Sequence, residues 1–390
     1  MNKRGGMMFF LFLIFLVLTF FIPTASAYEK EITNCQELQD IKYDLKGNYY
    51  LANDIDCSET KSWNDGRGFE PIGNSEEAFR GSFDGRGYKI SGLYINRGNL
   101  WDVGLLGSVG WGGNIKNVKL IDVNITGYGD VGGLIGSNIH GNVRNCSSEG
   151  RVSGEISVGG LVGTNNNANI SNSYSVVKIS EGDYIGGLVG DNYYGRIINS
   201  YSKVEFFSKY GFILGGLAGD NTGEILGCYA EAKISGDELI GGLVGMNENG
   251  TISNCYSKGN VYYSEGCIFC EKLGGLVGEN NGTIINSYSI VDVPDEINTG
   301  GLVGKNDENG TCKNSFWDKE ISGQEFSDCG KGKTSEEMKK DSTFTYVGWD
   351  FKNIWNRDDL TNGGYPYLRN IGREVKFIGI IGEEGEEKEG

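Results

Sequence analysis

One hexapeptide constrains the fold of this chain more than any other feature, because it recurs along most of the sequence. Its clearest form is Val-Gly-Gly-Leu-Val-Gly at residues 158–163, which we call the glycine box. The glycine before the leucine of each copy lies at positions 104, 133, 160, 187, 216, 242, 275 and 301, so the repeat units are 26 to 33 residues long. Self-similarity at such a period predicts a solenoid in which successive units stack on one another.

A second block follows each glycine box at a nearly constant distance, and it reads Asn-Ser-Tyr-Ser at residues 172–175 and 199–202. The chain has 64 glycines and only 4 prolines, and the units lack the long 3.6-residue periodicity of helices. A unit of this length accommodates three strands of about five residues and three turns. We therefore predict an all-β fold, a three-sided parallel β-helix with coils of about 27 residues.

Alternation after the second block indicates which side chains face the core. Tyr229, Glu231 and Lys233 alternate with small and branched residues, so period-two geometry places the tyrosine and the charged residues outside. The equivalent tyrosines should stack as an exposed ladder: Tyr174, Tyr201, Tyr229, Tyr256 and Tyr288. The residues before them should stack inside, with the cysteines as buried free thiols: Cys146, Ser173, Ser200, Cys228, Cys255 and Ser287.

An asparagine precedes the inner residue of this block in most units. Asparagine tolerates a left-handed backbone, and Gly227 replaces it in one unit, so we expect positive φ at a corner of the coil. The asparagines at this position are Asn145, Asn172, Asn199, Asn254, Asn286 and Asn314.

The two ends of the chain depart from the repeat. Residues 1–27 have a basic start, an apolar run and an Ala-Ser-Ala ending, as in a cleaved signal peptide, with an uncleaved anchor as the alternative. Residues 28–68 should form an N-terminal cap whose helix opens with a capping box at residues 33–36. The repeats would then occupy residues 69–318. A C-terminal cap over the far end should span residues 319–372, with a second capping box at Thr334, before an acidic, disordered tail at residues 373–390.

Charge and cysteine content restrict the partners and the compartment. The formal net charge is −17, which argues against a nucleic-acid partner, and no segment of the mature chain is apolar enough to span a membrane. Six cysteines lie outside the repeat register, and in an exported chain they suggest disulfides. We predict the pairs Cys35–Cys57 and Cys312–Cys329 and a loop closed by Cys267 and Cys270, although sequence alone does not fix the connectivity.

The glycine box with its following Asn-Ser/Cys-Tyr-Ser block resembles the GLUG-motif repeat proteins. Further resemblance lies at residues 69–93, Ser315-Phe316-Trp317-Asp318 and Tyr365-Pro366-Tyr367-Leu368. The resemblance implies a right-handed parallel β-helix in an exported, adhesin-like surface protein. Such repeats also occur beside immunoglobulin-A-cleaving proteases, but no peptidase motif is present here, and the family supplies no catalytic residues to transfer.

Most catalytic schemes find no support in the residues. The single histidine, His140, lacks a positioned partner, which argues against the usual triads and against an H-E-x-x-H zinc site. Asp191 and Asp220 share one register position in neighbouring units, so the alternative is a polysaccharide-degrading hydrolase or lyase that uses stacked carboxylates. We expect neither a cofactor nor a metal.

The tyrosine ladder is the strongest binding candidate, because aromatic rings with polar neighbours suit sugars or a protein surface. A purely stabilising role for the stacked rings is the competing interpretation. The inserted loop at residues 265–270 is a further candidate. Candidate glycosylation sequons begin at Asn124, Asn169, Asn249, Asn281 and Asn309, while Asn145 competes with its corner role.

The sequence therefore predicts a secreted or cell-surface repeat protein without catalysis. Its role would be adhesion, glycan or partner binding, or envelope structure, with glycans or surface proteins as partners. The oligomeric state and the mode of surface attachment stay open.

Overall fold

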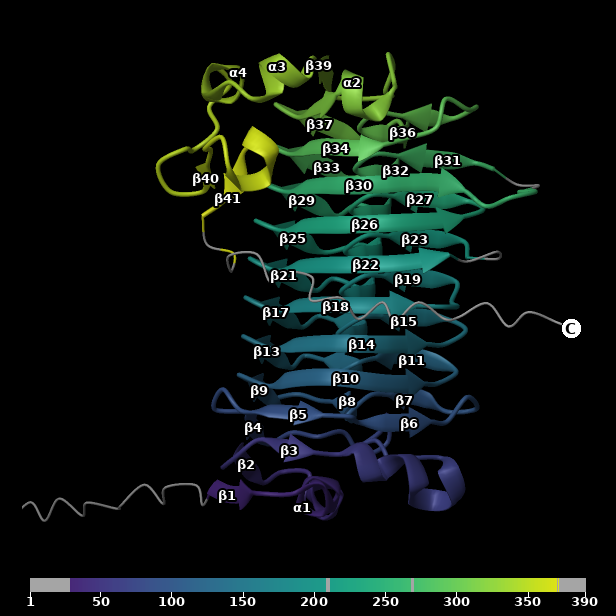
Figure 1. Cartoon of the computed structure of the whole chain (residues 1–390), viewed down its shortest axis with the longest axis vertical. Coiled ribbons are helices and arrows are strands. Elements are labelled where there is room, and N and C mark those ends of the chain that lie inside the picture. Colours follow the sequence, from purple (N-terminus) through teal and green to yellow (C-terminus); the bar gives the residue numbers. More distant parts are fainter. Residues whose placement is uncertain (1–28, 208–210, 268–269, 370, 372–390) are drawn as a thin grey trace, which may run out of the picture.

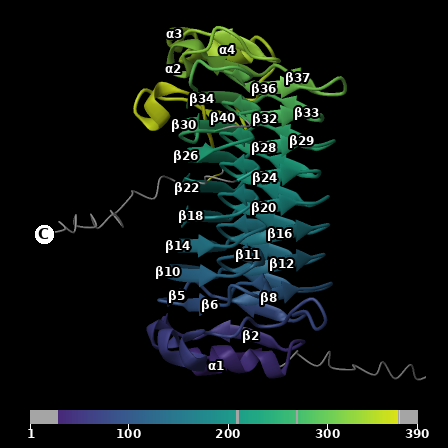
Figure 2. The ribbon, with the colours of Figure 1, turned by 90° about the vertical axis from the view of Figure 1, so that its right-hand side faces the viewer.

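A computed structural model describes residues 29–207, 211–267, 270–369 and 371. Parallel strands stack coil upon coil into a solenoid, which confirms the predicted fold class (Figure 1). The front strands in Figure 1 run from left to right while the chain climbs, so the winding is right-handed. Figure 2 shows the same climb from the side. The predicted signal peptide and acidic tail lie outside the described residues.

Each full coil contains four short strands instead of the predicted three, because the glycine box bends the chain between two of them. In chain order, a coil passes through sheets D, C, A and B. The coil at residues 129–153 shows the pattern, with β11 (Gly129–Gly132), β12 (Ile135–Ile139), β13 (Asn142–Arg144) and β14 (Ser147–Ser153).

Sheets D and C flank the glycine boxes. Sheet D also contains β7 (Trp101–Val103), β15 (Ser157–Gly159), β19 (Tyr184–Gly186), β23 (Ile213–Gly215), β27 (Leu239–Gly241), β31 (Lys272–Gly274) and β35 (Thr299–Gly300). Sheet C also contains β8 (Leu106–Val109), β16 (Val162–Asn166), β20 (Val189–Asn192), β24 (Ala218–Asn221), β28 (Val244–Asn247), β32 (Val277–Asn280) and β36 (Val303–Asn306).

Sheets A and B extend into the caps. Sheet A also contains β1 (Glu29–Ile32), β2 (Asn48–Leu51), β4 (Ser82–Asp84), β9 (Asn114–Lys116), β17 (Asn169–Ser171), β21 (Arg196–Ile198), β25 (Glu224–Leu226), β29 (Thr251–Ser253), β33 (Thr283–Ile285) and β37 (Thr311–Lys313). Sheet B also contains β3 (Ile55–Asp56), β5 (Lys89–Ser91), β6 (Tyr94–Asn96), β10 (Lys119–Thr126), β18 (Tyr174–Ile179), β22 (Tyr201–Phe207), β26 (Tyr229–Gly236), β30 (Tyr256–Tyr263), β34 (Tyr288–Asp292), β38 (Phe316–Asp318) and β39 (Lys331–Lys333).

The glycine box is required by the close approach of backbones at the corner between sheets D and C. A Cβ atom on Gly159 would overlap the carbonyl oxygen of Val162, and one on Gly160 would overlap the carbonyl oxygen of Gly187 in the next coil. The leucine of the box points inward, and Leu161 is fully buried. A Cβ atom on Gly159 would also meet the backbone nitrogen of Gly190 in the next coil, so a side chain at either glycine would push neighbouring coils apart.

Two polar columns run through the interior. The predicted Ser/Cys column is confirmed, because each backbone N–H of this position donates to the side chain one coil further on, as Ser173 donates to Ser200 Oγ at 3.1 Å. The thiols of Cys146, Cys228 and Cys255 are free and buried, as predicted. A second column, which we did not predict, is an amide chain in which Asn165 Nδ2 donates to Asn192 Oδ1 at 2.8 Å. Its members are Asn138, Asn165, Asn192, Asn221, Asn247, Asn280 and Asn306.

The predicted corner asparagines adopt positive φ, from 48° to 55°, and Gly227 has φ 62°. All three predicted disulfides are present: Cys35–Cys57, Cys267–Cys270 and Cys312–Cys329. Each feature fixes local geometry: the asparagines turn the coil, and the disulfides tie segments outside the repeat register.

Short helices lie in both caps. They are α1 (Cys35–Asp40), α2 (Lys319–Ser322), α3 (Ser335–Met338) and α4 (Asp341–Thr345), with 3₁₀ turns at Ile41–Tyr43, Ser58–Gly66 and Thr361–Gly364. The capping box at Thr334 is confirmed, but the N-cap of α1 is Asn34 instead of Thr33, because Asn34 accepts from the Glu37 N–H. A short antiparallel pair, β40 (Trp355–Asn356) and β41 (Tyr367–Leu368), ends the described fold.

Candidate functional site

The five ladder tyrosines stack on the outer face of sheet B, as predicted. Successive ring centroids lie 4.9 to 5.1 Å apart, with planes within 9° of parallel. Their predicted exposure is wrong for four of them, since Tyr201, Tyr229, Tyr256 and Tyr288 are only 0 to 7% exposed. Tyr174, the first tyrosine of the ladder along the chain, is half-buried. The ladder is therefore not an open aromatic platform.

The C-terminal segment accounts for this burial. Residues 338–369, which we call the C-terminal cover, form one buried cluster with the ladder tyrosines. In Figure 1, α4 lies over the far end of the solenoid while β40 and β41 lie beside it, which corrects our expectation that the segment covers the far end alone. Trp355 is fully buried, and its ring centroid lies 5.9 Å from that of Tyr288 and 6.2 Å from that of Tyr256. Polar contacts anchor the segment, because Tyr288 Oη donates to the Pro366 carbonyl and Tyr365 Oη donates to Asp318 Oδ2 at 2.7 Å.

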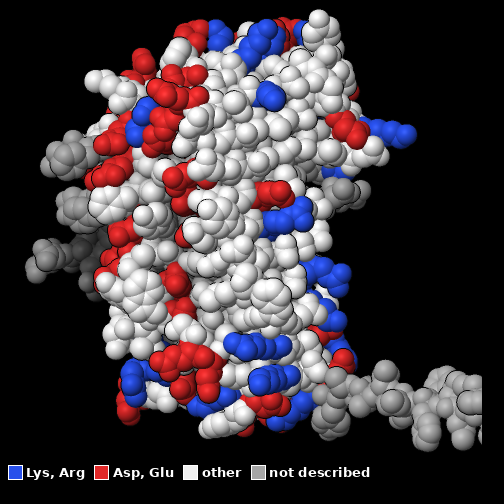
Figure 3. All heavy atoms as spheres, turned by 180° about the vertical axis from the view of Figure 1, so that it is seen from behind, with Lys and Arg blue, Asp and Glu red and all other residues white. Residues whose placement is uncertain are grey.

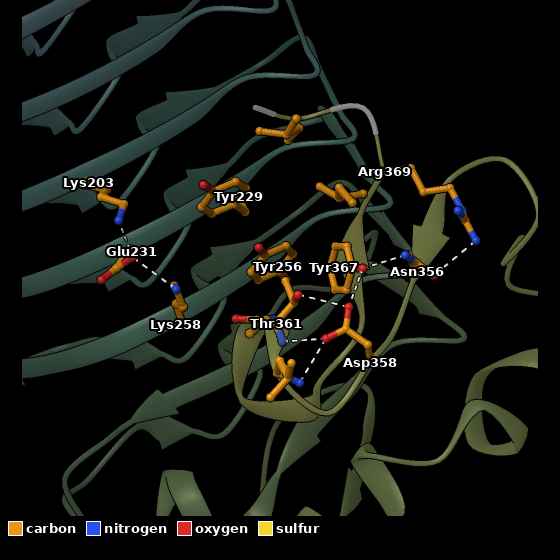
Figure 4. A pocket seen from close by; sticks show the side chains of 14 residues that line it. Lys203, Tyr229, Glu231, Tyr256, Lys258, Asn356, Asp358, Thr361, Tyr367 and Arg369 are labelled. Carbon is orange, nitrogen blue, oxygen red and sulfur yellow. Dashed lines mark hydrogen bonds and ion pairs between the residues drawn. The ribbon is translucent and has the colours of Figure 1, made fainter. Parts of the chain in front are cut away.

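A cleft remains between the cover and sheet B, with a volume of about 600 Å³ (Figure 4). Strands β22, β26 and β30 supply one wall, and the residues around β40 and β41 supply the other. The labelled lining residues are Lys203, Tyr229, Glu231, Tyr256, Lys258, Asn356, Asp358, Thr361, Tyr367 and Arg369. The cleft thus combines three tyrosines with amide, hydroxyl and charged groups.

Hydrogen bonds fix the cover side of this cleft. Tyr367 Oη donates to Asp358 Oδ2 at 2.6 Å and accepts from Asn356 Nδ2 at 2.5 Å. Asp358 also accepts from the Thr361 backbone N–H at 2.6 Å. The hydrogen bonds from Tyr367 and Thr361 lower the pKa of Asp358 to about 2, so this carboxylate stays ionised.

Ion pairs fix the sheet side. Glu231 lies between two lysines, 3.3 Å from Lys203 Nζ and 3.1 Å from Lys258 Nζ. Burial alone would raise the pKa of Glu231, but the two lysines outweigh it and hold the pKa below its usual value. Both walls of the cleft are therefore held in place by their own contacts.

A second cluster lies near the corner between sheets D and C. Asp191 of β20 and Asp220 of β24 are paired in register, so their strands lie about 4.8 Å apart, as the sequence predicts. Figure 3 shows acidic side chains recurring up the left half of the rear face. Burial, then the charges of Asp220 and Asp130, raises the pKa of Asp191 to about 7. Burial and the charge of Glu248 raise the pKa of Asp220 to about 6, despite a hydrogen bond from the Asn221 N–H.

The remaining candidates are scattered. His140 is exposed in a turn, 4.8 Å from the ring of Trp111. The sequon asparagines Asn124, Asn169, Asn249 and Asn309 are exposed and Asn281 is half-buried, while glycosylation itself stays a prediction. The loop at residues 265–270 is closed by its disulfide, and residues 268–269 lie outside the described part of the chain.

Sequence reasoning missed the residues of the cover that line the cleft, chiefly Asn356, Asp358 and Tyr367. They follow the last repeat, so no periodicity marks them. The one available signal was the high aromatic content of residues 344–367, which indicates that this segment covers something. It does not indicate which surface is covered.

Together, the stacked sheets, inward-facing glycine boxes and capped ends define a right-handed parallel β-helix protein. The model of the GLUG motif matches residues 127–153, 154–180 and 236–262. Each match covers one coil, so the chain contains repeats of the GLUG motif, as the resemblance implied.

Two related proteins extend the comparison. Halomucin of Haloquadratum walsbyi is 41% identical over 135 residues, which are 33% of this chain and 2% of that protein. A protein described as a Gly-rich membrane protein, from Evansella cellulosilytica, is 32% identical in an alignment of 410 positions that covers 86% of this chain and 44% of the relative. The chain therefore spans less than half the length of each of these relatives.

A solved structure of an IgA1 protease matches with a TM-score of 0.52 at 18% identity, over 82% of this chain and 24% of that one. This likeness shows the shared fold alone. Within the described residues, no helix has the length and apolar character to cross a membrane. Those residues also contain no cluster of three or more potential metal ligands from histidine, cysteine, aspartate and glutamate.

Proposed function

We propose that this protein is an extracellular β-helix that binds carbohydrate, without catalysis, in the cleft between sheet B and the C-terminal cover. The carrying observation is the convergence of tyrosine, amide and ionised groups in one preorganised cleft. Aromatic rings pack against the apolar faces of sugars, while carboxylates and amides bond to their hydroxyl groups. Three disulfides and the predicted signal peptide support an exported location.

The cleft also revises the role of the ladder. An open row of rings would offer a flat, nonspecific surface, whereas the cover leaves only Tyr229 and Tyr256 of the ladder beside the cleft. Asp358 and Asn356 are both hydrogen-bonded to Tyr367 Oη. Their fixed positions determine which arrangement of sugar hydroxyl groups the cleft accepts. The expected ligand is a short saccharide.

The test is a glycan-array screen followed by calorimetric titration of the best ligand. Tyr367→Phe keeps the ring but removes the hydroxyl group between Asn356 and Asp358, so we expect at least fivefold weaker binding. Tyr174→Phe is the matched control, because it removes the same hydroxyl group from a tyrosine that lies outside the cleft, and it should bind normally. The absence of any saturable glycan, or equal binding by both variants, would contradict the proposal.

A second candidate function is polysaccharide cleavage at Asp191 and Asp220. The favouring observation is that their pKa values, about 7 and about 6, let one carboxyl be protonated while the other is ionised near neutral pH. Their in-register spacing is close to the ~5 Å separation of retaining glycosidases. Reducing ends released from a polysaccharide mixture should disappear in Asp191→Asn, and release that persists unchanged would rule out this pair.

A further inference from the structure

A row of exposed aromatic side chains lies far from the cleft, at the turns between sheets C and A. Trp111 is 74% exposed, Tyr194 is 59% exposed and Tyr193 is 43% exposed. Val109 pairs with Asn138, and Ile139 pairs with Asn166, so the turns that carry Trp111 and His140 are consecutive. The next turn carries Asn166 and Asn167, and the turn with Tyr193 lies one coil beyond it, since the Asn167 N–H donates to the Tyr193 carbonyl at 2.9 Å. We call Trp111, His140, Tyr193 and Tyr194 the aromatic row.

The backbone at this corner does not favour aromatic residues. Tyr194 has φ 50° and His140 has φ 58°, both in the left-handed region. Other coils place asparagine at this corner with similar angles, as at Asn167 with φ 49° and Asn249 with φ 59°. Asparagine and histidine are enriched in this region, whereas a bulky side chain such as that of Tyr194 is an outlier there.

Burial within the fold does not compensate Tyr194 for this strain. Its ring contacts Tyr193 edge-on at 4.5 Å, but more than half of the side chain faces solvent. Trp111 is similarly open, with its ring 4.8 Å from that of His140. In the turn of Trp111 the positive φ falls on Gly112, so the strained tyrosine is Tyr194 alone, and a strained side chain that is not buried points to a role outside the fold.

The surroundings indicate the chemistry of the partner. A row of exposed amides runs beside the aromatic row at the first position of sheet A, in register along β9, β13 and β17: Asn114, Asn142 and Asn169. Asn169 Nδ2 donates to Asn142 Oδ1 at 3.1 Å, so the amides are ordered along the solenoid axis. The aromatic turns themselves carry no lysine, arginine, aspartate or glutamate, and the next residue in the register of the amides, Arg196, is paired with Glu224 at 2.7 Å.

We propose that the aromatic row and its amides form a second carbohydrate site, which binds an extended, uncharged polysaccharide strand along the solenoid axis. Rings stack on sugar faces, and the amides bond to hydroxyl groups. The row spans three coil steps, or roughly 14 Å at the spacing of parallel strands, which suits several linked sugars. This site is independent of the cleft, because it is built from other sheets and from the first half of the chain.

The test uses affinity gel electrophoresis and pull-down of the full chain with neutral polysaccharides: cellulose, xylan, chitin and soluble glucans. Wild-type protein should be retarded by at least one of them. Tyr194→Asn installs the residue that neighbouring coils use, so the thermal midpoint should stay equal or rise while retardation falls at least fivefold. Trp111→Ala should give a comparable loss.

Two controls separate binding at the aromatic row from binding elsewhere on the protein. Tyr43→Asn removes a tyrosine that is 79% exposed in the N-terminal cap and should leave retardation unchanged. Tyr367→Phe should also leave it unchanged, which distinguishes this site from the cleft. Retardation by none of the polysaccharides, or undiminished retardation of Tyr194→Asn, overturns the proposal. Capture of a protein partner through the row without polysaccharide binding overturns it as well.

Discussion

Replacement of Asp191 by asparagine should stabilise this protein in alkaline solution. Burial and the nearby charges of Asp220 and Asp130 raise the pKa of Asp191 from 3.8 to about 7. Its Oδ1 atom is buried without a hydrogen-bond partner among the described residues. The ionised carboxylate is therefore poorly compensated in the folded state, and an uncharged amide of the same shape removes that cost.

The sign follows from proton linkage. Between about pH 4 and pH 7 the folded protein holds a proton on Asp191 that the unfolded chain has released, so the free energy of unfolding falls as pH rises through this window. A shift of this size corresponds to ~4 kcal/mol at full ionisation. Because the amide is itself partly desolvated, we expect Asp191→Asn to gain about 2 to 4 kcal/mol at pH 8 and almost nothing at pH 4.

Urea unfolding followed by tryptophan fluorescence at pH 4, 6 and 8 measures this difference. Asp122→Asn, at an exposed position of β10, controls for the loss of one negative charge from an acidic chain. If Asp191→Asn gained no stability at pH 8, or gained equally at pH 4, the burial argument would be refuted.

Two further predictions concern the cover and the interior. Trp355→Ala should destabilise the packing of the cover on the solenoid by about 3 to 5 kcal/mol, because this fully buried ring packs on the ladder. Proteolysis within residues 349–369 should therefore accelerate. An unchanged cleavage rate would show that Trp355 does not hold the cover in place. Asn192→Ala breaks the interior amide chain on both sides, because Asn165 Nδ2 loses one of its two acceptors and Asn221 Oδ1 loses its amide donor. It should lower the free energy of unfolding by about 2 to 4 kcal/mol, whereas Asn260→Ala on the outer face should change it little.

The parts of the fold that repeat could be predicted from the sequence because they depend on local geometry. Period-two alternation predicted the inner Ser/Cys column and the stacking of the tyrosines. Asparagine chemistry set the positive φ at Asn172 and its equivalents. The count of strands per coil was wrong, because the bend made by the glycine box divides one expected strand into two.

The candidate sites were less accessible to such reasoning. Asp191 and Asp220 were found because they share a register position, but their raised pKa values depend on burial that no pattern reports. The cleft residue Asp358 was missed altogether, since its partners Thr361 and Tyr367 come together only through the turn between β40 and β41.

The sequence by itself thus determined the solenoid, its register and the inward or outward direction of the side chains in the Asn-Ser/Cys-Tyr-Ser block. These properties follow from spacing along the chain, and every coil imposes them again on the next. Only the tertiary structure decided that the tyrosine ladder is covered and that a cleft lies beside it. Where an aperiodic segment docks depends on the shape and apolar area of a surface formed by distant coils, and that surface exists only after the coils have stacked.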